Sequence, residues 1–180
     1  MSQAIVETNL IPRQTIEEHA TRVREENGIA ATVPVDPFAL ATQLGITVRA
    51  FKFYDPSLSG MLIRRPDRQE ILVRSGDPPA RQGFTVAHEL GHFFLHQDVE
   101  EFVDGEANLY RQDFSGDRDE TASDNRRREI QANMFAASLL MPEEQVRAAW
   151  RTEKSVKRLA WLFEVSQTAM QYRIDQLRLW

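Results

Sequence analysis

The stretch "FTVAHELGHFFLH" (residues 84–96) holds three of the four histidines of the chain, and they recur at every fourth position. Because residues i and i+4 lie on one face of an α-helix, His88, His92 and His96 are predicted to share a helix face. The other positions are mostly apolar. An unpaired polar group is costly to bury, so these imidazole rings need partners. The stretch therefore predicts a buried helix whose histidines bind something, and the three need not have the same role.

His88, Glu89 and His92 fit the pattern His-Glu-x-x-His. Two histidines one turn apart can bind one ion, while Glu89 is rotated by about 100° from His88, which suits a base beside the metal better than a ligand. Zinc lowers the pKa of a bound water to about 7, so a neighbouring carboxylate can take its proton near neutral pH. Gly91, which costs about 1 kcal/mol relative to alanine inside a helix, indicates close packing or access. The alternative is a pair of core histidines bonded to backbone carbonyls.

A catalytic zinc site needs a third protein ligand. His96 is a poor choice, because an i, i+4, i+8 row spreads along roughly 12 Å of helix axis. Packing or a hydrogen bond near the helix end is the favoured role for it. The sequence "EIQAN" places Glu129 and Asn133 one turn apart, so Glu129 can bind the ion and Asn133 can accept the N–H of a liganding histidine. The alternative for Glu129 is a solvated charge in "RRRE".

The composition limits the classes of function. The chain of 180 residues has no cysteine, which excludes disulfides, thiolate metal sites and cysteine nucleophiles. Its net charge is -5, from 22 basic and 27 acidic residues, which argues against a general nucleic-acid binder. The N-terminus has no signal-peptide pattern, and the longest apolar stretch, near "MFAASLLM" (134–141), is far short of a membrane span. We expect a cytoplasmic protein with no membrane partner.

Turn and capping signals divide the chain into several helices and a small sheet. We expect helices over 15–27, 37–44, about 76–96, about 126–140 and 142–150, two short helices within 155–178, a strand over 46–53, and a hairpin of 59–65 with 70–74. Thr15 and Glu18 fit a capping box, and Asp36 is the expected cap of the second helix. Residues 97–128 are polar and turn-rich, which predicts an irregular excursion. Strand 59–65 either packs as an ordinary hairpin or, at a sheet edge, pairs with an extended substrate.

"FTVAHELGHFFLH" and "EIQANMFAASLLMP" together resemble the ImmA/IrrE metallopeptidases, a gluzincin-type group, and weaker similarity covers roughly residues 30–178. The resemblance implies an α+β fold that is mostly helical and zincin-like, with a small antiparallel sheet. By the same resemblance, His88, His92 and Glu129 match the zinc ligands, and Glu89 matches the catalytic base. Zn²⁺ is the expected cofactor, with Mn²⁺ or another divalent ion as the alternative.

The C-terminal segment is expected to form a separate unit. We predict a metallopeptidase domain over residues 1–150 and a helix-turn-helix-like extension over residues 151–180 that packs on it. Direct DNA binding is one interpretation of this extension, because it holds six basic residues against three acidic ones. Its apolar positions favour packing on the catalytic unit, or contact with a repressor, instead. The basic residues are Arg151, Lys154, Lys157, Arg158, Arg173 and Arg178.

The resemblance implies a metalloendopeptidase with a specific protein substrate. The family is associated with bacterial and phage regulation, and its members act as anti-repressors on helix-turn-helix repressors that are often encoded nearby. The alternatives are a toxin-like effector, of the toxin–antitoxin kind, and a non-catalytic protein that acts by binding such a regulator. The developing oxyanion needs a further donor, for which Tyr110 and His96 are the candidates. The sequence predicts no oligomeric state.

Overall fold

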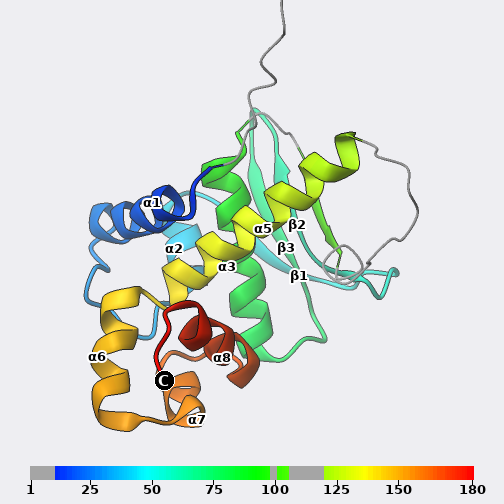
Figure 1. Cartoon of the computed structure of the whole chain (residues 1–180). Helices are drawn as coiled ribbons and strands as arrows, with labels where there is room; N and C mark the ends of the chain where they lie inside the picture. Colours follow the sequence, from blue (N-terminus) through cyan, green and yellow to red (C-terminus); the bar gives the residue numbers. More distant parts are fainter. Residues whose placement is uncertain (1–10, 98–100, 106–119) are drawn as a thin grey trace, which may run out of the picture.

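The structure is a computed structural model, and it describes residues 11–97, 101–105 and 120–180. These ranges hold seven helices and four strands (Figure 1). The helices are α1 (Arg13–Glu26), α2 (Pro37–Gln43), α3 (Pro79–Leu95), α5 (Glu120–Leu140), α6 (Glu143–Glu153), α7 (Val156–Leu162) and α8 (Gln167–Gln176). The strands are β1 (Thr47–Phe51), β2 (Leu58–Arg64), β3 (Gln69–Arg74) and β4 (Glu101–Gly105).

The four strands form one sheet in the order β1-β3-β2-β4. The α+β class is confirmed, but the sheet is mixed rather than antiparallel, because β1 runs parallel to β3. The hairpin of β2 and β3 causes this, since it folds β3 back into the place beside β1. β2 pairs with β3 on one side and with β4 on the other. The idea that β2 is an edge strand open to an added substrate strand is therefore wrong.

The expected irregular excursion over 97–128 contains regular structure. β4 lies within it, and α5 begins at Glu120, six residues before the predicted start. β4 pairs with a strand about forty residues earlier in the chain, and local patterns do not reveal such a partner. Tyr110 lies outside the described residues, so its role stays a prediction.

Helix ends follow the predicted capping in one case and not in the other. The side chain of Asp36 accepts hydrogen bonds from the backbone N–H groups of Phe38 and Ala39, at 2.9 and 3.1 Å, as expected. The capping box of Thr15 and Glu18 is wrong, because α1 already begins at Arg13 after Pro12 and has no side-chain cap.

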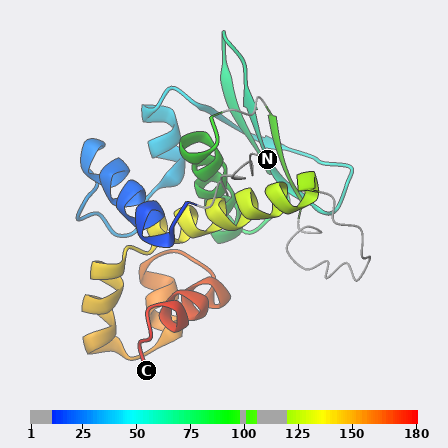
Figure 2. The same cartoon turned by 45° about the horizontal axis from the view of Figure 1, so that its top comes forward.

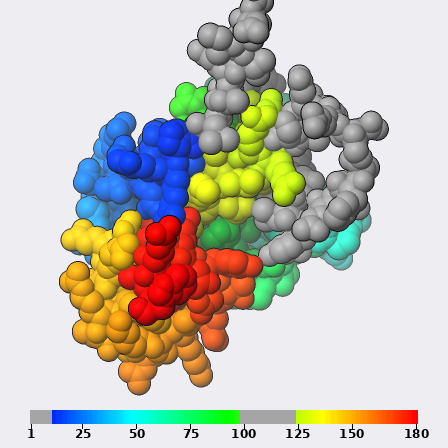
Figure 3. All heavy atoms as spheres, in the orientation of Figure 1, coloured from blue at the N-terminus to red at the C-terminus, as the bar shows by residue number. Residues whose placement is uncertain are grey.

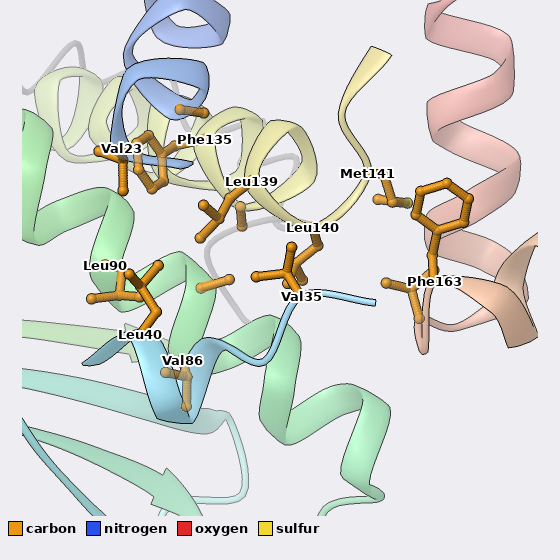
Figure 4. Packing of buried hydrophobic residues seen from close by; sticks show 14 of the residues in the cluster. Val23, Val35, Leu40, Val86, Leu90, Phe135, Leu139, Leu140, Met141 and Phe163 are labelled. Atoms are coloured by element: carbon orange, nitrogen blue, oxygen red, sulfur yellow. The ribbon is translucent and has the colours of Figure 1, made fainter. Parts of the chain in front are cut away.

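α3 lies at the centre of the molecule, between the sheet and α5, which crosses it (Figures 1 and 2). Every residue from Thr85 to His92 is buried, so the predicted buried helix is confirmed. Val86 and Leu90 of α3 point toward Leu40 of α2, and beyond them lie Phe135 and Leu139 of α5 (Figure 4). Burying such side chains stabilises the fold by about 1.5–3 kcal/mol each. In the space-filling view only small patches of α3 show between α5 and the C-terminal helices (Figure 3).

The helices α6, α7 and α8 gather at the end of the molecule away from the sheet (Figures 1 and 2). Phe163, which follows α7, packs near Met141 at the end of α5, so the hydrophobic cluster continues into this group (Figure 4). The boundary at residue 150 stays a prediction. Among the described helices, none is long and apolar enough to cross a bilayer.

Arg173 of α8 ties the C-terminal helices to α1. The side chain is only 1% exposed, and its Nη1 and Nη2 atoms lie 2.7 and 2.9 Å from the two carboxylate oxygens of Glu17. Its Nε donates to the carbonyl oxygen of Met141 at 2.8 Å. This bidentate arrangement, with two N–H groups on two carboxylate oxygens, is the stronger geometry for an arginine–carboxylate ion pair. Arg173, counted above among the basic residues of the extension, therefore holds the fold together and does not face a partner.

We expect Glu17→Gln to destabilise the protein in a pH-dependent way. Burial raises the pKa of Glu17, but the hydrogen bond and charge of Arg173, together with those of Arg13, outweigh burial and hold it below its ordinary value of 4.5. A carboxylate with a lowered pKa stabilises the folded state above its ordinary pKa, and this stability is lost as the pH falls through the lowered pKa. Because Glu17 is only half-buried, solvent screens the pair, and removing its charge costs about 1–2 kcal/mol rather than the full cost for a buried pair. Urea unfolding at pH 7 should show this loss, and a pH series should show it shrinking in acid.

Glu18→Gln is the matched control, because Glu18 is on the same helix and is exposed. It should change the free energy of unfolding by less than about 0.5 kcal/mol. A difference between wild type and Glu17→Gln that stays constant from pH 7 to below pH 4 would contradict the pairing described here.

Candidate metal centre

Arg64 of β2 fixes the end of α3 that carries the histidines. The last carbonyl groups of a helix lack partners within it, and a cation there is favourable. The guanidinium of Arg64 donates to the carbonyl oxygens of His96, Phe93 and His92, at 2.9, 3.0 and 3.2 Å. It also lies over the Phe93 ring, 5.4 Å from the ring centre. The sheet therefore holds the C-terminal turn of α3 through several contacts at once.

α3 and α5 approach closely where they cross. A Cβ atom added at Gly91 would lie 2.9 Å from the Cα atom and 3.0 Å from the carbonyl oxygen of Ala132. Backbone cannot yield as a flexible side chain can, so a larger residue at Gly91 would push the helices apart. The predicted close packing at Gly91 is confirmed. The short separation lets side chains of α5 reach those of α3.

Three side chains direct possible metal-ligand atoms toward one point where α3 and α5 cross. The Nε2 atoms of His88 and His92 are 3.0 Å apart. His88 Nε2 lies 3.2 Å from Oε2 of Glu129, and His92 Nε2 lies 3.3 Å from Oε1 of the same carboxylate. A tetrahedral zinc ion with bonds of about 2.0–2.1 Å has ligand atoms separated by roughly 3.3 Å. The donor set and its spacing therefore fit a divalent cation, and this group could hold one. Glu129 is only 8% exposed, so the interpretation of it as a solvated surface charge is wrong.

The charge states of these side chains suit a cation. Burial lowers the pKa of His92 to about 4, although the hydrogen bond to Glu129 opposes this shift. Burial raises the pKa of Glu129, but its contacts with His88 and His92 outweigh this effect and lower it to about 2. At neutral pH the His92 ring is therefore neutral and Glu129 is ionised. Metal binding requires these forms, because a protonated ligand cannot donate its lone pair.

The second nitrogen of each of these histidines also has a partner. His88 Nδ1 lies 3.0 Å from Asn133 Oδ1, where the sequence predicted Asn133 to lie. His92 Nδ1 lies 3.0 Å from Nδ1 of His96, and His96 Nε2 lies 2.8 Å from Gln131 Oε1. His96 therefore sits behind His92, on the side away from the converging donors. Sequence reasoning missed Gln131, because helical spacing points it away from Glu129 and only the crossing of the two helices brings it to His96.

Glu89 is fully buried and lies against the backbone of β2. A Cβ atom added at Gly60 would lie 2.6 Å from Oε1 of Glu89 and 2.4 Å from Cγ2 of Thr85. β2 has an irregularity between Leu58 and Gly60, where its pairing with β4 shifts. Such bulges commonly occur beside active sites and redirect a strand locally. Gly60 thus provides the space that the Glu89 carboxylate occupies, and sequence reasoning gave no signal for it.

Comparison with known proteins places this arrangement in a family. The profile of the IrrE N-terminal-like domain of the peptidase M78 family matches residues 41–175. The chain is 31% identical, over 115 residues, to the radiation response metalloprotease IrrE of Deinococcus radiodurans, an alignment that covers 62% of this chain and 32% of that protein. The chain thus spans about a third of the length of this relative.

A transcriptional regulator of Mycobacterium tuberculosis shares the fold, with a TM-score of 0.62 and 18% sequence identity. The similarity covers 89% of this chain and 46% of the regulator. The family profile begins in α2, ends in α8 and includes all four residues of the crossing, His88, Glu89, His92 and Glu129. Since that profile covers well over half of the sequence, the protein belongs to the peptidase M78 family of IrrE N-terminal-like domains.

Proposed function

We propose that the protein is a zinc-dependent metalloendopeptidase that hydrolyses a peptide bond in a specific protein. The observation that carries the proposal is the convergence of His88 Nε2, His92 Nε2 and the Glu129 carboxylate within 4.8 Å of one another. Glu89, which follows His88 directly in the chain, is not one of these three residues and is fully buried. Three protein ligands with an open fourth position are typical of catalytic zinc sites. Membership of a peptidase family and similarity to a metalloprotease support the same activity.

In the proposed reaction each residue of the site has one task. A divalent cation held by His88, His92 and Glu129 would supply Lewis-acid activation of a water molecule and of the substrate carbonyl. Glu89 is the general base, which takes a proton from the attacking water and passes it to the leaving amine. Its position against Gly60 fixes the carboxylate before the substrate binds. Asn133 accepts the Nδ1 proton of His88 and so leaves Nε2 free to bind the metal.

The proposed substrate is a helix-turn-helix transcriptional repressor encoded near this protein, which would make the protein a cytoplasmic anti-repressor. The family resemblance supports this choice, and so does the surface of the C-terminal helices. Trp161, Tyr172 and Trp180 are 82, 64 and 83% exposed there, and aromatic residues are enriched at protein interfaces. Direct DNA binding is the weaker proposal, because Arg173 is buried and Arg158 is paired with Glu153 at 3.0 Å.

The metal site predicts one bound zinc ion per chain. Wild-type protein dialysed against zinc and then against buffer should retain about one equivalent by elemental analysis. Glu129→Gln should weaken zinc binding by more than about 100-fold, because it removes the anionic ligand. Glu144→Gln, at an exposed position on α6, is the matched control and should bind like the wild type. A wild-type protein that cannot be loaded with zinc would contradict the proposal.

Glu89→Gln separates catalysis from binding. The variant should keep its zinc and its fold, yet cleave the neighbouring repressor at least about 100-fold more slowly, because the amide cannot take a proton. The measurement is the appearance of discrete fragments when the purified repressor is incubated with zinc-loaded protein. If Glu89→Gln still relieves repression fully in cells, the protein acts by binding its partner and the peptidase proposal fails.

Gly60→Ala tests whether the space at Gly60 fixes the position of the Glu89 carboxylate. The added methyl group needs the space of Glu89 Oε1 and Thr85 Cγ2, so the carboxylate must shift. A displacement of about 1 Å at a catalytic group can cost about 100-fold in rate. We expect repressor cleavage to fall by about this factor while zinc affinity stays within about threefold of wild type. Gly76→Ala is the control, since nothing lies within 4 Å of its added Cβ. Equal cleavage rates for the two variants would contradict this account.

A further inference from the structure

We infer that His96 and Gln131 are positioning residues that fix the tautomer and the ring orientation of His92. The inference rests on the proposed metal site and adds two residues to it that bind neither metal nor substrate. The chain of contacts runs from His92 Nδ1 to His96 Nδ1 at 3.0 Å, and from His96 Nε2 to Gln131 Oε1 at 2.8 Å.

With His92 Nε2 kept unprotonated for a cation, only one arrangement of protons satisfies this chain. His92 Nε2 points at the donors of His88 and Glu129, so it must be unprotonated to bind a cation, and the ring proton resides on Nδ1. That N–H faces His96 Nδ1, which must then accept. The neutral His96 ring therefore carries its proton on Nε2, and this N–H donates to the side-chain carbonyl oxygen of Gln131. The amide oxygen at the far end thus sets the tautomer of both rings.

Burial makes the chain of hydrogen bonds decisive. His92, His96 and Gln131 are all less than 6% exposed, so solvent does not compete for these groups. A buried histidine without this acceptor would have to leave its N–H unsatisfied or move its proton to the metal-binding nitrogen. Each of the two metal-facing histidines of α3 is thus held, directly or through one ring, by an amide of α5.

The end of α3 explains why the third histidine can take this role. His96 is the residue at which the helix stops, with φ of -127° and ψ of 66°. Its carbonyl oxygen is bound by Arg64 at 2.9 Å, which fixes the backbone there. The ring turns back toward His92, and both of its nitrogens have contacts within 3.0 Å. A role as a donor to substrate would require one of these contacts to break, so the geometry favours positioning.

Two substitutions at His96 distinguish positioning from simple filling of space. His96→Asn offers an oxygen acceptor near the place of Nδ1, whereas His96→Leu fills the space without an acceptor. Loss of a residue that orients a metal-binding histidine costs about 10- to 100-fold in metal affinity. Measured by competition with a chelator, zinc affinity should fall by about this factor in His96→Leu and by less than about threefold in His96→Asn. A purely structural role predicts the opposite order, because buried leucine costs less than buried asparagine.

Gln131→Met and a spectroscopic measurement complete the test. Gln131→Met keeps the volume of the side chain and removes a strong acceptor, so its zinc affinity should fall by about tenfold. Ring ¹⁵N chemical shifts of the zinc-loaded wild type should show the proton of His96 on Nε2 and that of His92 on Nδ1. The opposite tautomer at His96, or wild-type affinity in His96→Leu, would overturn this inference while leaving the peptidase proposal intact. A wild-type protein that binds no zinc would overturn both.

Discussion

The close approach of α3 and α5 at Gly91 and Ala132 is the constraint on which the site depends. His88 and His92 come from one helix and Glu129 from the other, and the close approach of the two backbones at Gly91 helps these side chains to reach one another. The 2.9 Å that would separate a Cβ at Gly91 from the backbone of Ala132 leaves no room for a side chain. The glycine, which weakens a helix taken alone, is here the condition for bringing the two helices together.

The crossing of α3 and α5 also offsets the unfavourable free energy of burying these polar side chains. Imidazole, carboxylate and amide groups in an apolar core are destabilising unless each finds a partner. α5 supplies those partners from one stretch: Glu129 faces the Nε2 atoms, while Asn133 and Gln131 serve the histidine nitrogens on the far side. Side chains held in this way would need little rearrangement to bind the proposed cation, because the proposed hydrogen bonds leave the Nε2 atoms unprotonated.

The sequence predicted those parts of the site that depend on local geometry. Helical spacing alone places His88 beside His92 and Glu129 beside Asn133, and the resemblance to a known family joins the two pairs. Gly60 was not predictable, since its contact with Glu89 depends on how β2 lies over α3. The sequence also did not predict that β4 pairs with β2 or that β1 runs parallel to β3. Both pairings join strands that are far apart in sequence, and local patterns do not reveal such partners. Helical spacing predicts which side chains share one face of a helix, whereas the packing of helices and strands decides which of these faces come into contact.

The row of three histidines shows how one spacing produces two roles. The ring centres of His88 and His92 are 4.7 Å apart, and those of His92 and His96 are 5.1 Å apart, so the rings form a continuous line along α3. An ion at the first pair is too far along the axis for the third ring to bind it. The His96 ring still reaches Nδ1 of His92, the nitrogen on the side away from Glu129. In the proposed site, a histidine one helical turn beyond His92 is therefore too far along the axis to be a ligand and close enough to orient the His92 ring.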